Sequence, residues 1–295
     1  MEPRLHYCYG IGPGGFHRQA YQDWQGPDRH PLTVCVHGLT RNSRDFDCLA
    51  SELSKQRHVV CPDIVGRGES DWMRLSSTYS YPNYVSDMAM LINRLGVDEV
   101  DWVGTSMGGL IGMMMAASNR SPVRRLVLND VGPMIPKQVL SRILDYLGQE
   151  FEFTSLDHIE AHLRLVHAPF GQLTDQQWRQ MAEHSARQDD DGNWRLHYDP
   201  AIAEPLLAAP LQDVDLWAVW DQIKCPVLVI RGGDSDLLLP ETAEEMTRRG
   251  PKADLITIAD VGHAPALMDE AQIGAVHEWL MQFEPVEEDE EEDGG

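Results

Sequence analysis

The sequence has no long apolar run, few cysteines and few basic residues. None of its apolar runs approaches the roughly 20 residues that a membrane-spanning helix needs. The amino-terminal stretch also lacks the apolar core of a signal peptide. The five cysteines are odd in number and form no C-x-x-C pair, which favours reduced thiols over a disulfide framework. We therefore expect a cytoplasmic protein without a membrane partner.

The charge balance is strongly acidic. Lys and Arg total 24 against 47 Asp and Glu, which gives a net charge of −23. Eight of the acids lie in the tail 284–295, so the rest of the chain carries −15. A body this acidic repels phosphate backbones, which argues against a nucleic-acid partner, and it favours uncharged substrates at long range. The tail is predicted to be disordered, because its like charges repel one another and it has little apolar surface to bury.

The spacing of apolar residues alternates between strand-like runs and helical patterns. The strand-like runs lie at residues 32–38, 58–64, 100–106, 123–131, 225–233 and 255–263. Strands that alternate with helices predict an α/β fold, with a parallel sheet covered by helices on both faces. Between residues 133 and 218 the segments are helical only. We therefore expect a helical cap at 133–218, inserted between two parts of one core at 1–132 and 219–283.

A serine lies between two glycines at the end of a predicted strand, in the stretch V-G-T-S-M-G-G at residues 103–109. A strand that runs straight into a helix forces a tight turn, so the positions two residues from the turn must be small. Gly104, Ser106 and Gly108 fit this G-x-S-x-G nucleophile elbow. Ser106 is therefore the predicted nucleophile. A turn serine that only caps the helix is the alternative.

A serine hydroxyl needs a base to accept its proton and an acid to orient that base. His263 follows the last predicted strand, and loops at the carboxyl ends of parallel strands gather at the edge where Ser106 is expected. Asp234 and Asp236 follow the preceding strand, and the order Ser106, Asp236, His263 is that of the α/β-hydrolases. Asp130 is a rival acid, because it ends the strand that follows the elbow helix.

Two backbone N–H groups are candidates for an oxyanion hole. One belongs to Met107, directly after the serine. The other belongs to Leu39, in the loop where His37-Gly38 lets the chain turn. The pair His158 and His162 lacks the H-E-x-x-H pattern of a zinc protease, so we predict no metal and no cofactor.

Six motifs in order resemble those of the α/β-hydrolase fold superfamily, in its serine-nucleophile, esterase-like branch with a helical cap. They are VHGLTRNSRDF, PDIVGRGESD, GTSMGGLIG, LVLNDVGP, RGGDSDLLLP and VGHAP, within residues 30–283. The resemblance implies an eight-stranded, mostly parallel sheet with a cap after the sixth strand. It also favours Asp236 as the acid, because Asp236 begins a D-x-x-x-P stretch. Ser106 argues against membership of the branches whose nucleophile is an aspartate. The loop sequence HGLT, in place of HGGG, argues against the hormone-sensitive-lipase-like branch.

These features predict a metal-free serine hydrolase whose partner is a small carboxylic ester, including oligomeric hydroxy-acid esters. Carbon–carbon bond hydrolysis of a diketone and a non-catalytic small-ligand receptor are the alternatives. Large apolar residues of the cap are expected to shape an acyl pocket for short to medium chains; they are Trp178, Trp194, Trp217, Phe170, Tyr146 and Leu147.

Overall fold

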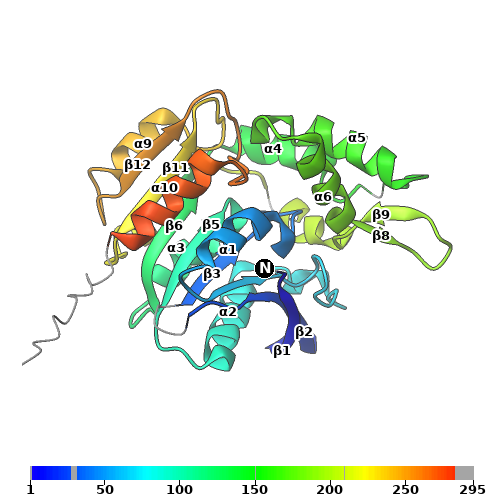
Figure 1. Cartoon of the computed structure of the whole chain (residues 1–295), viewed down its shortest axis with the longest axis horizontal. Helices are drawn as coiled ribbons and strands as arrows, with labels where there is room; N and C mark the ends of the chain where they lie inside the picture. Colours follow the sequence, from blue (N-terminus) through cyan, green and yellow to red (C-terminus); the bar gives the residue numbers. More distant parts are fainter. Residues whose placement is uncertain (1, 28–31, 150, 209, 283–295) are drawn as a thin grey trace, which may run out of the picture.

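The centre of the protein is an eight-stranded sheet (Figure 1). The computed structural model describes residues 2–27, 32–149, 151–208 and 210–282, so the predicted disordered tail lies outside the described residues. In spatial order the strands are β1 (Arg4–Gly12), β2 (Gly15–Trp24), β4 (Val59–Pro62), β3 (Leu32–Val36), β5 (Val100–Thr105), β6 (Val123–Asn129), β11 (Val227–Gly232) and β12 (Asp254–Ile258).

The six strands from β4 to β12 pair in parallel, while β1 pairs with β2 and β2 with β4 in antiparallel register. The predicted mostly parallel, eight-stranded α/β sheet is therefore confirmed. The spacing of apolar residues does not predict the β1–β2 hairpin. Most of β1 is exposed at the sheet edge. The buried positions of β2 include the polar residues Gln19, Gln22 and Asp23, so neither strand forms an apolar run in the sequence.

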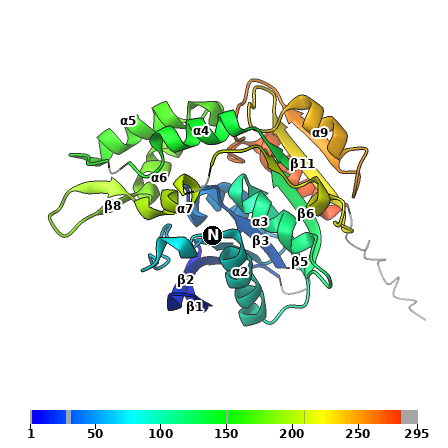
Figure 2. The ribbon, with the colours of Figure 1, turned by 180° about the vertical axis from the view of Figure 1, so that it is seen from behind.

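Helices cover both faces of the sheet (Figures 1 and 2). α1 (Asp47–Leu53) and α10 (Glu270–Met281) pack on one face, and α2 (Tyr81–Leu95) and α3 (Met107–Ala116) pack on the other. Successive strand residues point to opposite faces, so Val34 belongs to the α3 side of the core and Cys35 to the α1 side. Within the described ranges, no helix is both long and apolar enough to cross a bilayer.

The chain between β6 and β11 carries mostly helices, and its described part adds no strand to the eight-stranded sheet. In Figure 1 the helices α4, α5 and α6 lie together at one end of the sheet. The elements of this segment are β7 (Met134–Ile135), α4 (Lys137–Tyr146), α5 (Leu156–Val166), η3 (Ala168–Phe170), α6 (Asp175–Ser185), β8 (Ala186–Gln188), β9 (Trp194–Leu196), η4 (Pro200–Ala203), α7 (Glu204–Leu207), β10 (Val214–Asp215) and α8 (Trp217–Trp220).

The β8–β9 hairpin differs from the expected all-helical segment. Its two short strands flank the polar turn that the sequence shows at residues 189–193. Asp189 accepts the backbone N–H of Asn193 at 2.8 Å, and Gly192 takes a φ of +83°. Three-residue strands are too short to produce a visible alternation of apolar residues, so the turn is the only local signal of this hairpin.

Candidate active site

Ser106 occupies a strained turn between β5 and α3. Its φ of 51° and ψ of −114° are unusual for a residue with a side chain. A Cβ added to Gly104 would lie 2.4 Å from the Gly108 carbonyl oxygen, and one added to Gly108 would lie 2.0 Å from the carbonyl oxygen of Val36. Both glycines are therefore required by the close approach of strand and helix. Ser106 makes no side-chain cap to α3, so the geometry does not support the helix-cap alternative.

His263 lies in the loop after β12 and faces Ser106. Its Nε2 atom is 3.0 Å from the Ser106 hydroxyl oxygen, and its Nδ1 atom is 2.7 Å from Oδ2 of Asp130. Because Nδ1 keeps its proton and donates a hydrogen bond to the carboxylate, Nε2 is unprotonated and can accept the proton of the serine hydroxyl. The three side chains thus form a continuous hydrogen-bonded chain from serine to carboxylate.

The structure brings Asp130 to the imidazole, and Asp236 does not reach it. Asp236 is half exposed and pairs with Arg142 of α4, and Asp234 lines the adjacent cavity. The expectation that Asp236 contacts His263 is therefore wrong. The D-x-x-x-P stretch has a different local role, since Pro240 begins α9 (Pro240–Met246) at a position where a missing N–H costs nothing.

Asp130 is held by the loop that was expected to supply the acid. The carboxylate is fully buried and accepts the backbone N–H of Gly232 at 2.8 Å and the Ser235 hydroxyl at 2.5 Å. The Asp130 N–H in turn donates to the carbonyl of Ile230 in the neighbouring β11 at 2.8 Å. The signal that made Asp130 the rival acid is its place at the end of β6, and β6 pairs directly with β5, the strand that precedes Ser106.

The loop after β3 lies directly beside the serine. A Cβ added to Gly38 would be 3.8 Å from the Cβ of Ser106. Neither the Leu39 N–H nor the Met107 N–H donates to a protein acceptor within the part of the chain that the structure describes. For Met107 this follows from its place in the first turn of α3, where N–H groups have no partner inside the helix.

His37 fixes the shape of this loop from beneath. Its Nε2 atom accepts the N–H of Ile64 at 2.9 Å, so Nδ1 carries the proton and donates it to the Gly38 carbonyl at 2.7 Å. Burial lowers the pKa of His37 to about 4, which keeps the ring neutral. The Gly38 carbonyl is turned toward His37, and in a trans peptide the N–H of Leu39 then points the opposite way.

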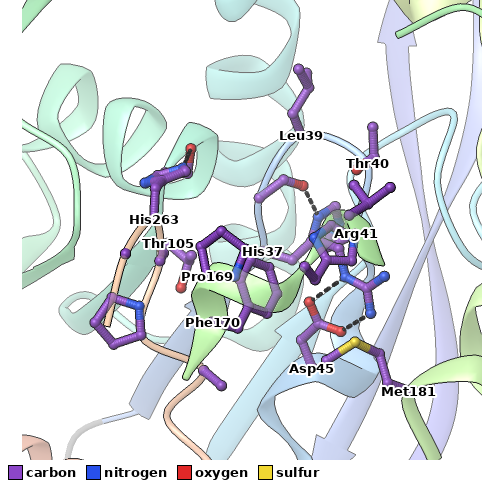
Figure 3. A pocket seen from close by; sticks show the side chains of 18 of the residues that line it. His37, Leu39, Thr40, Arg41, Asp45, Thr105, Pro169, Phe170, Met181 and His263 are labelled. Atoms are coloured by element: carbon purple, nitrogen blue, oxygen red, sulfur yellow. Dashed lines mark hydrogen bonds and ion pairs between the residues drawn. The ribbon is translucent and has the colours of Figure 1, made fainter. Parts of the chain in front are cut away.

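A cavity of about 560 Å³ opens above Ser106 and His263 (Figure 3). Its core side is formed by the loops after β3, β5, β11 and β12, and its other side by residues of α4, α5, η3 and α6. Of the six large cap residues singled out in the sequence, Tyr146 and Phe170 line the cavity. Trp178 and Leu147 are buried in apolar clusters instead, and Trp194 and Trp217 pack beside such clusters.

Burial also sets the charge of a second imidazole on the cavity wall. His167 packs against the ring of Phe170 with ring centres 4.5 Å apart, and burial holds its pKa well below the ordinary value. A neutral His167 adds polarity to the wall without adding charge. The ionic groups at the wall come mainly from two ion pairs, Arg41 with Asp45 and Arg142 with Asp236.

Comparison with known proteins agrees with this architecture. The profile of the alpha/beta hydrolase family matches residues 33–276. A 3-hydroxybutyrate-oligomer hydrolase from Cupriavidus necator is 47% identical over 279 residues, which span 92% of this chain and 95% of that protein.

Two solved structures superpose closely. A protein from Rickettsia typhi has a TM-score of 0.88 at 32% identity, covering 96% of this chain and 100% of its own. An alpha/beta hydrolase from Novosphingobium aromaticivorans has a TM-score of 0.85 at 34% identity, covering 95% and 98%. The likeness to these two structures extends over nearly the whole chain.

Proposed function

Because this chain belongs to the alpha/beta hydrolase family, we propose that it hydrolyses carboxylic esters through an acyl-enzyme, and that oligomers of 3-hydroxybutyrate are its substrates. The observation that carries the proposal is the chain of hydrogen bonds from Ser106 through His263 to Asp130 at the floor of the cavity. The substrate is taken from the Cupriavidus necator relative, whose similarity covers nearly the full length of both chains.

In the first half of the reaction, the Ser106 oxygen attacks the ester carbonyl while Nε2 of His263 takes the hydroxyl proton. Asp130 orients the imidazole and stabilises its positive charge. The N–H groups of Leu39 and Met107 donate to the oxyanion of the tetrahedral intermediate. When that intermediate collapses, the ester C–O bond breaks, and the departing alcohol takes the proton from His263.

In the second half, water replaces the alcohol. Nε2 of His263 takes a proton from the water as its oxygen attacks the acyl-enzyme carbonyl, and the second tetrahedral intermediate is held by the same two N–H groups. Its collapse returns the proton to Ser106 and releases the carboxylic acid. The segment 133–218 acts as a cap that limits the space for the acyl group, since its helices form one wall of the cavity.

The test compares wild type with Ser106→Ala on 4-nitrophenyl acetate and on the 3-hydroxybutyrate dimer and trimer. The wild type should show a burst of 4-nitrophenol equal to the enzyme concentration, followed by turnover. Ser106→Ala should remain folded and lose about 10⁴-fold in kcat. Hydrolysis that persists in the folded alanine variant would disprove the nucleophile.

The same preparations separate the two alternative functions. A receptor would bind the esters without turnover. A carbon–carbon hydrolase would cleave a diketone substrate in preference to the esters. Either result would replace the proposed ester hydrolysis.

A further inference from the structure

Arg142 links the cap to the core across the cavity wall. It lies on α4, and its guanidinium meets the carboxylate of Asp236, in the loop after β11, through both Nη atoms. The Nη2 to Oδ1 distance is 3.0 Å, and Nη1 pairs with Oδ2. Both residues line the cavity above Ser106. The Arg142 guanidinium therefore already binds a carboxylate, that of Asp236.

Two arginines line the cavity among the described residues, and they differ in how easily their partners can be replaced. Arg41 binds Asp45 through Nε and Nη2 at 2.8 and 2.6 Å, with side chains only 6% and 19% exposed. If another anion displaced Asp45, a largely buried carboxylate would be left without its partner, which is costly.

The Arg142 pair is exposed to solvent. The side chains of Arg142 and Asp236 are 54% and 51% exposed. Ion pairs at this level of exposure contribute little to stability, and the Asp236 carboxylate remains in contact with water when Arg142 releases it. An incoming carboxylate can therefore take the place of Asp236 on Arg142 at little cost.

The chemistry of the proposed substrate supplies such a group. An oligomer of 3-hydroxybutyrate is neutral along its ester backbone and carries one carboxylate at its end. The acidic body of the protein repels that charge at long range, so a cation at the cavity wall is needed to hold it. A guanidinium binds a carboxylate with two parallel hydrogen bonds, as Arg142 already does with Asp236.

We propose that Arg142 is the binding site for the terminal carboxylate of the substrate, and that Asp236 holds the guanidinium until the substrate replaces it. This inference rests on the proposed function, because it takes the oligomer from there. It predicts a preference for free-acid oligomers over the same oligomers with an esterified end. Asp236 acts as an internal competitor, so its removal strengthens the binding of the free acid.

The experiment measures kcat and KM for the 3-hydroxybutyrate trimer and for its terminal methyl ester. In Arg142→Gln, KM for the free acid should rise about tenfold, and the ratio of kcat/KM for acid over methyl ester should fall by the same factor. In Asp236→Asn, that ratio should rise instead. Arg248→Gln is the matched control, because Arg248 forms an exposed pair with Glu244 and does not line the cavity.

A binding measurement separates this inference from the proposed chemistry. Calorimetric titration of Ser106→Ala with the free-acid trimer should give a tighter Kd than Ser106→Ala/Arg142→Gln by about tenfold. Equal affinities, or an unchanged acid-to-ester ratio in Arg142→Gln while hydrolysis still depends on Ser106, would overturn the role of Arg142 and leave the ester hydrolase intact. A wild type that neither binds nor hydrolyses either trimer would overturn both.

Discussion

Asp130 and His263 are 133 residues apart in the chain, and the Oδ2 atom of the first lies 2.7 Å from the Nδ1 atom of the second. The carboxylate is fully buried, and the Gly232 N–H and the Ser235 hydroxyl donate to it as well. It is thus fixed in one orientation beneath the imidazole.

Asp130→Asn should lower kcat for a neutral ester by about 10³- to 10⁴-fold, because an amide leaves the imidazolium without a counter-charge and can favour the wrong tautomer. Asp236→Asn should change the same kcat by less than about threefold, since Asp236 contacts Arg142 and not His263. Steady-state kinetics on 4-nitrophenyl acetate measures both. A collapse of kcat in Asp236→Asn with near-normal Asp130→Asn would restore the assignment expected from the sequence.

Gly108→Ala should destabilise the fold by about 3 kcal/mol or more, because the new Cβ would lie 2.0 Å from the backbone oxygen of Val36, which cannot move aside. Gly274→Ala is the control. Gly274 lies in α10 with open space around it, so the alanine should be neutral or stabilising by up to about 1 kcal/mol. Urea unfolding of the three proteins gives the comparison. Equal stabilities would contradict the tight strand–helix contact.

His37→Gln should show a pH-dependent loss of stability. The folded-state pKa of His37 is about 4, below the ordinary 6.5, so its contribution is complete above pH 6.5 and is lost as the pH falls toward 4. The free energy of unfolding should therefore differ most between wild type and His37→Gln near pH 7, and the difference should shrink at pH 5. Urea titrations at the two pH values measure it. A constant difference would show that His37 is not held neutral by burial.

Phe170→Ala should shift acyl selectivity toward longer esters, because Phe170 lines the cavity above the serine. The ratio of kcat/KM for 4-nitrophenyl octanoate over acetate should rise severalfold, in line with the one to three kcal/mol that pocket shape contributes to such choices. Trp217→Ala is the control, since Trp217 packs against the core and under Arg249, outside the cavity lining. An equal change in both variants would mean that the cap acts only through stability.

Much of the fold and part of the site follow from local patterns. The alternation of buried strands and amphipathic helices predicts the parallel sheet, because a strand buried on both faces must be apolar along its length. The spacing of Gly104, Ser106 and Gly108 predicts the elbow, because the tight turn leaves no room for a side chain two residues before or after the serine. This spacing can be read directly from the sequence. The position of His263 directly after the last predicted strand indicates it as the base.

Which carboxylate contacts His263, and which residues line the cavity, depends on how distant parts of the chain pack together. Asp130, Asp234 and Asp236 all follow strands that end at the same edge, so local patterns give three candidate acids but do not choose among them. That choice depends on the pairing of β6 with β11, which buries Asp130 beside Gly232 and Ser235, whereas Asp236 pairs with Arg142 at the cavity wall. Contacts between strands that are distant in sequence produce no periodic pattern of residues, because the two partners come together only when the chain folds.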